Sequence, residues 1–412
     1  MKFIDDGPDI PESLLLEHEE GKVIFFCGAG ISCEADLPTF ENLINKILVK
    51  ENLQTHTLLQ KLKNRNEYDR IINYLDSICV GGRAKIRKDV YDILQPNIEK
   101  ENALKTHKSL LCLSKNINND ICIVTTNYDH LFVEASKQLN YPLNEYIAPL
   151  LPVPKKNKWN GVVYLHGRLP YSVSESEQLN SIVISSGDFG IAYLIERWAV
   201  RFVEELIRNY SLCFIGYSLK DPILRYIIDA LAADRMQGMQ HNNVWIFAGY
   251  DHLEENDIQQ EWEIIGVSPI LYKIISNNHN LLHDTLYEWA KTYKKGVYGK
   301  RDIILKYANR KLDCLLDDDI RKILWAMSDT SGCSAECFSK ISPTPSLEWL
   351  NILSTFYIVN NYILKFNYKI NQDKNTEASE SFAKFNSNLS IHTISIFRDN
   401  DQNENMIKSY FF

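Results

Sequence analysis

The stretch "VIFFCGAGISCEADLPTF", residues 23–40, constrains the fold more than any other part of the sequence. Its first five residues are large and apolar, as in a strand that is buried on both faces of a parallel sheet. Gly28 and Gly30 then permit a sharp turn with close approach of the backbone, and the residues after them can begin a helix whose free N–H groups attract phosphate. An ordinary strand-to-helix turn has the same pattern, so the rest of the chain has to decide between the two.

Composition excludes several classes of function. The chain has 412 residues, of which 45% are hydrophobic and 24% charged, as in a soluble globular protein. Its net charge is −8, so we expect no direct binding of nucleic acid. The acidic start and the lack of a long apolar run predict no signal peptide and no membrane span, and hence a cytoplasmic location. The mixed-charge runs 61–70 and 84–88 are typical of solvated helix faces.

The nine cysteines indicate buried thiols and no metal site. Cys27, Cys122 and Cys213 fall inside apolar runs, where a free thiol behaves as a small hydrophobe. Cys333 and Cys337 form the one close couple, without a second couple or a histidine at the spacing of zinc ligands. We therefore expect no structural zinc.

Further apolar runs repeat the character of the first one. Helical spacing fills many of the intervals between them, as in "FGIAYLIERWAVRFVEELIRNY". Strands that alternate with helices predict an α/β fold, a Rossmann-like doubly wound parallel sheet. The expected strands are 121–126, 161–167, 181–186, 212–218, 243–249 and 269–275.

The pattern also predicts two domains. Residues 1–295 form the expected catalytic domain, with a helical insertion over about 41–118 that would stand over the carboxyl end of the first strand. The polar segment 290–302 has the composition of a linker. Residues 296–412 are expected to form a smaller carboxyl-terminal interaction or oligomerisation domain, with helices in 303–365 followed by strands over 362–371 and 389–397.

Polar residues gather where the apolar runs end. In an open α/β sheet the carboxyl ends of the strands line the ligand crevice, so these groups are expected to converge on the turn after the first strand. Each has an ordinary alternative as a turn residue, a helix cap or a structural histidine. Their conjunction in a fixed order favours a nucleotide site. The residues are Thr125, Thr126, Asn127, Asp129, His166, Gly216, Ser218 and Asp221.

In series, "GAGIS" with "LPTF", then "TTNYD", "LHG" and "GYSLKDP" resemble the signatures of sirtuins over about residues 20–290. The resemblance implies a Rossmann-type fold that binds nicotinamide adenine dinucleotide (NAD) and breaks its nicotinamide–ribose bond. It assigns catalytic roles to Asn127 at the ribose and the attacking water, Asp129 at the nicotinamide amide, and His166 as the base. It also implies that the cofactor contacts Gly28, Ala29, Gly30, Ser32, Phe40, Thr126, Gly216 and Ser218.

Departures from the deacylase pattern decide which reaction the resemblance implies. Glu41 stands where deacylases carry arginine, Asp36 stands at a glycine position, and no cysteine follows His166 before Cys213, so the four-cysteine zinc module is missing. With the peptide groove expected to be missing too, water becomes the acceptor. The chain is then similar to the NAD hydrolases of bacterial anti-phage defence.

The resemblance extends to partners. The length is similar to that of sirtuin-like subunits that act with a HerA-type hexameric ATPase, the Nezha-type systems, so we expect a homo-oligomer with conditional activity and such a partner. Two other functions stay open: an NAD-dependent protein deacylase or ADP-ribosyltransferase, and a non-catalytic module that senses NAD or ADP-ribose. The presence of both Asn127 and His166 argues against the sensor, which needs no base at a strand end.

Overall fold

A computed structural model describes residues 1–353, apart from 117, 157, 173–175, 219–241, 252–254, 277, 329–332, 343–344, 346–347 and 350–351. The chain divides into two compact units. One comprises Phe3–Ala290 and the other Met1–Lys2 together with the chain from Lys291 onward. The expected strands 362–371 and 389–397, and Asp221, lie outside the described residues.

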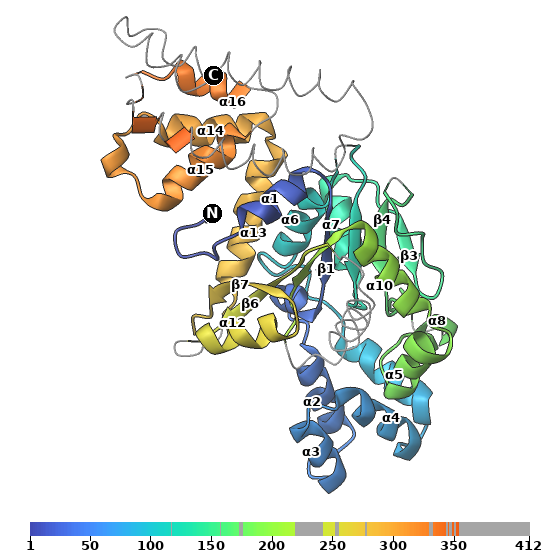
Figure 1. Cartoon of the computed structure of the whole chain (residues 1–412). Helices are drawn as coiled ribbons and strands as arrows, with labels where there is room; N and C mark the ends of the chain where they lie inside the picture. The colour runs from blue at the N-terminus through green and yellow to red at the C-terminus, as the bar shows by residue number, and fades with distance from the viewer. Residues whose placement is uncertain are drawn as a thin grey trace, which may run out of the picture. The chain divides into compact units, whose positions relative to one another are not determined.

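The larger unit is built on a seven-stranded, fully parallel sheet, so the predicted α/β fold is confirmed (Figure 1). The strand order is β3-β4-β2-β1-β5-β6-β7. The chain forms β2, β3 and β4 on one side of β1 and then crosses to the other side at β5, which makes the carboxyl end of β1 a switch point where ligands bind in such sheets. The strands are β1 (Val23–Cys27), β2 (Cys122–Thr125), β3 (Glu145–Ile147), β4 (Gly161–Tyr164), β5 (Ser211–Ile215), β6 (Val244–Tyr250) and β7 (Ser268–Lys273).

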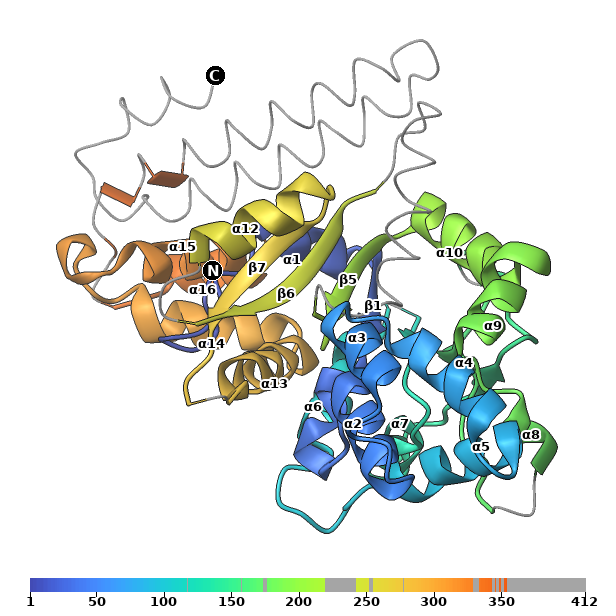
Figure 2. The same ribbon diagram turned by 90° about the horizontal axis from the view of Figure 1, so that it is seen from below.

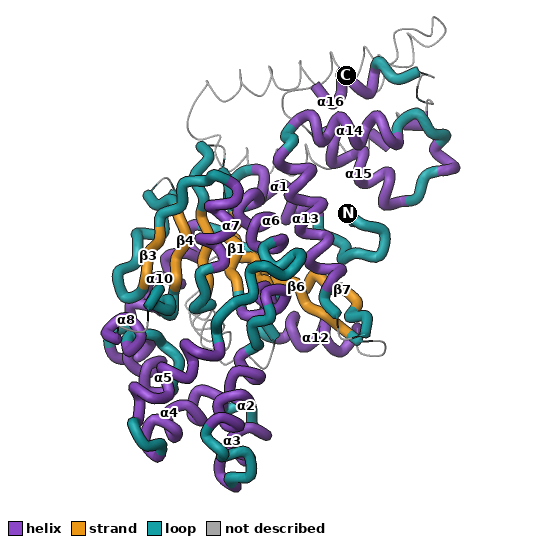
Figure 3. Tube along the Cα trace, turned by 180° about the vertical axis from the view of Figure 1, so that it is seen from behind, coloured by secondary structure: helices purple, strands orange, loops and turns teal. Residues whose placement is uncertain are grey.

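Helices cover both faces of the sheet because alternate residues of each strand point to opposite sides. On one face, Ile24 and Phe26 belong to a core cluster with α10 (Trp198–Asn209) and α12 (Glu255–Ile264). On the other, the ring of Phe25 lies 5.8 Å from the rings of His18 in α1 (Glu12–Glu19) and Trp289 in α13 (Asn280–Lys294). Figure 3 shows the strands in orange with helices in front of and behind them.

A run of helices follows the turn after β1. Four of its helices form a group of their own, drawn in blue in Figures 1 and 2, and a fifth, α6, packs beside α7 (Leu131–Leu139) in the sheet layer. The insertion helices are α2 (Phe40–Lys50), α3 (Thr57–Asn64), α4 (Tyr68–Ile78), α5 (Gly82–Ile93) and α6 (Lys105–Leu113).

One charged residue of the run 84–88 is not solvated, contrary to the prediction, whereas Lys88 of the same run is exposed. Arg87 in α5 is fully buried, and its guanidinium pairs with Asp76 in α4 at 3.3 Å and with Asp188 at 2.6 Å. Asp188 also accepts from Ser185 in a capping box that begins α9 (Ser186–Phe189). Ion pairing therefore joins the insertion to the segment after β4, because a charge can be buried only when it is paired.

Two expectations about strands are wrong. Residues 181–186 form no strand, because Ser185 caps a helix there. Residues 182–184 are buried, but they do not pair with a neighbouring strand. The short strand β3 was not expected, since its sequence "EYI" is only partly buried at the edge of the sheet. The remaining connections are α8 (Ser176–Asn180) and the π-helix η2 (Gly190–Ile195).

The smaller unit is helical where it is described. Its core includes Ile304, Tyr307, Ile323, Phe338 and Trp349. The expected linker over 290–302 is instead the end of α13 and the start of α14, which meet at Gly296 with a φ of +54°. Its elements are α14 (Val297–Tyr307), η3 (Leu312–Cys314), α15 (Asp317–Met327) and α16 (Cys333–Ser339).

Within the described part of the chain, no helix combines the length and apolarity that crossing a bilayer requires. The same residues contain no cluster of three or more His, Cys, Asp or Glu side chains that could hold a metal ion. Cys27, Cys122 and Cys213 are buried free thiols in the strands, as predicted.

Candidate functional site

The turn after β1 packs directly against the turn after β5. The amide of Gly28 donates to Ile215 O at 2.8 Å, and that of Gly30 donates to Gly216 O at 2.9 Å. A Cβ on Gly30 would lie 2.8 Å from Gly216 Cα, and Gly216 itself has a φ of +77°, which favours glycine. The glycines are therefore required by contact between two loops. Their amides, expected to bind diphosphate, donate to protein carbonyls in this structure.

The helix that follows the turn is a 3₁₀ helix, η1 (Ala29–Ala35), and it carries Ser32 into a buried polar cluster. The Ser32 hydroxyl donates to Asp129 Oδ2 at 2.8 Å and accepts from Asn127 Nδ2 at 3.1 Å. His107 Nε2 from α6 lies 3.4 Å from the same hydroxyl oxygen. Ser32 thus links three elements that are far apart in the sequence.

The side-chain amide of Asn127 is oriented by two oxygen atoms, one from a backbone carbonyl and one from a hydroxyl. Its Nδ2 donates to Gly28 O and to Ser32 Oγ, each at 3.1 Å, which uses both hydrogens of the side-chain amide. The orientation follows from this hydrogen-bond network. Asn127 lines the adjoining pocket, so Oδ1 is its remaining polar group and can accept a hydrogen bond from a ligand hydroxyl or a water molecule.

Both oxygens of Asp129 are also engaged. Oδ1 accepts from the Leu131 amide at 3.0 Å, in the first turn of α7, and Oδ2 accepts from Ser32. Burial raises the pKa of the Asp129 carboxyl, although these two donors oppose the shift. The turn-residue alternative is therefore realised at Asp129, which precedes the N-cap His130 of α7, and Asp129 lines the same pocket as Asn127.

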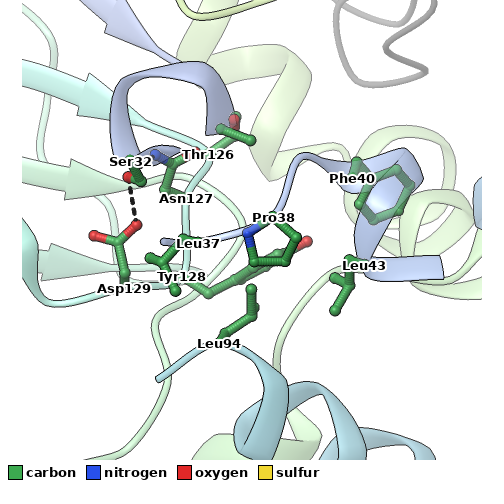
Figure 4. A pocket seen from close by; sticks show the side chains of 11 residues that line it. Ser32, Leu37, Pro38, Phe40, Leu43, Leu94, Thr126, Asn127, Tyr128 and Asp129 are labelled. Atoms are coloured by element: carbon green, nitrogen blue, oxygen red, sulfur yellow. Dashed lines mark hydrogen bonds between the residues drawn. The ribbon is translucent and has the colours of Figure 1, made fainter. Parts of the chain in front are cut away.

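The pocket beside this cluster has a polar side and an apolar side (Figure 4). The polar side comes from η1 and from the loop after β2, and the apolar side comes from the segment before α2, from α2 itself and from Leu94 after α5. The helical insertion thus borders the pocket at the carboxyl end of β1. The lining residues are Ala29, Ser32, Leu37, Pro38, Phe40, Leu43, Leu94, Thr126, Asn127, Tyr128 and Asp129.

Asp36, which departs from the deacylase pattern, directly precedes Leu37 of the pocket lining, and Phe40, an expected cofactor contact, belongs to that lining. Asp36 has a φ of +62°, a region that glycine adopts freely, and it is held there by Lys100 at 2.7 Å and Asn97 at 3.0 Å. Phe40 begins α2 and stacks edge-on against Tyr68. The structure thus explains why an aspartate is tolerated where the resemblance expects glycine.

His166 lies apart from the pocket lining. It follows β4 and is fully buried, with Nε2 at 2.8 Å from the hydroxyl of Tyr193 and its ring edge-on to Phe189 at 5.3 Å. Burial lowers the pKa of His166 to about 3, so the imidazole is neutral at neutral pH. The structure therefore brings Ser32, Asn127 and Asp129 together but leaves His166 outside the pocket lining, in contact with Phe189 and Tyr193.

The last predicted group lies around β5. Thr126 Oγ1 is 2.7 Å from the hydroxyl of Tyr217, which donates to Cys27 O at 3.2 Å. Gly216 contacts the turn after β1, whereas Ser218 is exposed at the limit of the described residues. His107 and Tyr193 were not predicted, because no spacing or motif in the sequence connects them to the site, and Tyr217 was not singled out although it lies in the motif "GYSLKDP".

Comparison with known proteins finds one matching family model. Residues 121–270 match the family model of the SIR2-like domain. The chain is thus similar to SIR2-like domains over these residues. The match spans Thr126–Asp129, His166 and Gly216–Ser218, whereas the turn after β1 lies outside it. Since SIR2-like domains use NAD as a substrate, the match supports an NAD-related enzymatic activity.

A curated relative is similar over most of the chain. The uncharacterized protein y4cA of Sinorhizobium fredii (strain NBRC 101917 / NGR234) is 27% identical over 365 residues, which cover 86% of this chain and 29% of y4cA. The chain therefore spans less than a third of the length of that relative.

Proposed function

We propose that the protein hydrolyses NAD at its nicotinamide–ribose bond, releasing nicotinamide and ADP-ribose. The observation that carries the proposal is the pocket at the carboxyl end of β1, where Asn127 and Asp129 face one cavity beside Ser32. This is the place where ligands bind in doubly wound sheets. The SIR2-like match supports NAD as the ligand.

The reaction requires stabilisation of positive charge. As the bond between the ribose C1′ and the nicotinamide nitrogen breaks, its electron pair leaves with nicotinamide and the ribose becomes cationic. Water adds to C1′ and gives up a proton. Asn127 Oδ1 can accept a hydrogen bond from that water or from a ribose hydroxyl, and the Asp129 carboxylate supplies nearby negative charge when ionised.

His166 is the proposed base for the proton that water releases. A neutral imidazole can accept a proton, but the burial that lowers its pKa to about 3 makes it a weak base, so this burial has to be relieved before His166 acts near neutral pH. In this structure its Nε2 is bonded to Tyr193, so the base is available only after that contact opens.

The apolar side of the pocket suits a flat ring. Leu37, Pro38, Phe40 and Leu43 offer apolar contacts opposite the polar cluster. These contacts can receive nicotinamide, but they could equally receive the acyl chain of a modified lysine. A deacylase is therefore the second candidate function.

One experiment separates the two candidates. The purified chain is incubated with NAD alone and with NAD plus an acetyl-lysine peptide, and nicotinamide, ADP-ribose and deacetylated peptide are quantified. Hydrolysis predicts equal amounts of nicotinamide and ADP-ribose without peptide. Nicotinamide release that needs the peptide, with deacetylated product, would replace the hydrolase by a deacylase.

Within the same proposal, the enzyme is an NAD-depleting effector of anti-phage defence. A cytosolic NAD hydrolase that is always active harms its host, which supports conditional activity. A homo-oligomer that acts with a HerA-type hexameric ATPase is the arrangement suggested by the resemblance. Mass photometry of the chain, alone and with such an ATPase, followed by NAD turnover, tests this part of the proposal.

A further inference from the structure

One segment of the chain encloses His166 on several sides. The amide of Val183 donates to His166 O at 2.9 Å, and the hydroxyl of Tyr128 holds Val183 O at 2.7 Å. Further along, Phe189 packs edge-on against the imidazole, and Tyr193 bonds to its Nε2. The imidazole is consequently 0% exposed, and neither water nor a ribose hydroxyl reaches it in this conformation.

Tyr193 belongs to an unusual helix. It lies in η2 (Gly190–Ile195), a π-helix, and π-helical turns are rare and are often found at functional sites. Two residues after its end, Arg197 has a φ of +56°, a strained conformation for a residue with a Cβ. The outer face of η2 carries Leu194 and Ile195, which are 72% and 76% exposed. The element is thus packed on one side only.

We propose that Tyr193 is a latch that keeps His166 out of reach, and that η2 must shift before the enzyme can turn over. The inference rests on the proposed function for its consequence in catalysis. His166 Nδ1 has no hydrogen-bond partner among the described residues, so the imidazole is held at Nε2 by the tyrosine hydroxyl. A buried nitrogen without a hydrogen-bond partner is uncommon, and the latch explains it if Nδ1 gains a partner when η2 shifts.

The expected size of the effect follows from a single hydrogen bond. Removing the hydroxyl while keeping the ring leaves the packing of Tyr193 intact and deletes its bond to Nε2. The net free energy of one such hydrogen bond typically corresponds to about a fivefold change in the population of the state in which η2 has shifted and His166 is exposed. Tyr193→Phe should therefore raise both the accessibility of His166 and the basal rate of NAD cleavage about fivefold.

Accessibility can be measured without any enzymatic activity. Diethyl pyrocarbonate modifies neutral imidazole nitrogens, and mass spectrometry of the peptide that contains His166 gives the rate of its modification in the full chain. The matched control is Tyr210→Phe, because Tyr210 is a buried tyrosine of the same core cluster. Melting temperatures within a few degrees of the wild type establish that both variants are folded.

The latch predicts that His166 is modified about five times faster in Tyr193→Phe and at the wild-type rate in Tyr210→Phe. An unchanged or slower rate in Tyr193→Phe overturns the proposal. If modification is faster but neither the wild type nor either variant cleaves NAD, the latch is supported and the proposed NAD hydrolysis is refuted. Faster modification with NAD cleavage below the wild-type rate overturns the latch, because Tyr193 would then assist catalysis.

Discussion

Replacing Arg87 by methionine should destabilise the larger unit strongly. The guanidinium is fully buried and joins Asp76 and Asp188, so its removal leaves two carboxylates in a region with little water. Loss of one partner from a buried ion pair typically costs 3–5 kcal/mol. Asp188 keeps a second partner, Arg83, at 2.6 Å, which places the expected loss near the low end, at about 3 kcal/mol.

Arg83 provides the matched control. It contacts the same two aspartates, but its side chain is 40% exposed, so water screens its charge. Arg83→Met should therefore lower the free energy of unfolding by no more than about 1 kcal/mol. Urea denaturation followed by tryptophan fluorescence measures both variants. A loss below about 1 kcal/mol in Arg87→Met, or equal losses in the two variants, would refute the reasoning.

The same pair predicts a dependence on pH. Burial by itself raises the pKa of Asp188, but Arg87, Ser185 and Arg83 outweigh burial and hold the pKa below its usual value. A carboxylate with a lowered pKa contributes stability above its unfolded pKa of about 3.9, and that stability is lost as the pH falls through the folded value. The difference between wild type and Arg87→Met should therefore shrink below about pH 4.

Three further predictions concern the site and its surroundings. His166→Ala should lower NAD cleavage by about a hundred- to ten-thousandfold with the fold retained, measured as nicotinamide release, and activity within a few-fold of wild type would exclude His166 as the base. Gly30→Ala should cost about 1–3 kcal/mol in thermal unfolding without any ligand, because its Cβ would meet Gly216 Cα at 2.8 Å; an unchanged melting temperature contradicts the loop contact. The free energy of unfolding should fall as the pH drops from about 6.5 towards 4. Burial lowers the pKa of His18 to about 4 and of His107 and His166 to about 3, so the unfolded chain binds more protons than the folded chain in this range. A urea midpoint that does not change across this range would contradict the burial of these histidines.

The sheet could be predicted because each buried strand carries its own signal. Short β-branched and aromatic runs next to glycine occur at β1, β4 and β5, and β2 has a similar run without glycine; all four strands are buried on both faces, as is typical of a parallel sheet. The run 181–186 has the same composition and is no strand, because Ser185 and Asp188 form a capping box whose geometry depends on contacts with Arg87. Composition alone does not distinguish these two cases.

The site could be predicted only in part, for the same physical reason. Ser32, Asn127 and Asp129 follow strands whose order in a doubly wound sheet brings them together, so the topology predicts their meeting. His107 and Tyr193 reach the site through side-chain packing between helices distant in the sequence, which no periodicity encodes. The need for Gly28 and Gly30 was foreseen, but the contacting group is the loop at Gly216.

The central claim is that NAD is cleaved at the pocket beside Asn127, and the most direct test is nicotinamide release by wild type and Asn127→Ala. The amide also donates to Gly28 O and Ser32 Oγ, so the substitution removes two hydrogen bonds and rates must be expressed per folded molecule. Asn42→Ala, on the exposed side of α2, is the matched control. The account predicts that wild type and Asn42→Ala release nicotinamide at equal rates. It predicts that the rate of Asn127→Ala is lower by at least about a hundredfold. Release by folded Asn127→Ala at the wild-type rate would contradict the account.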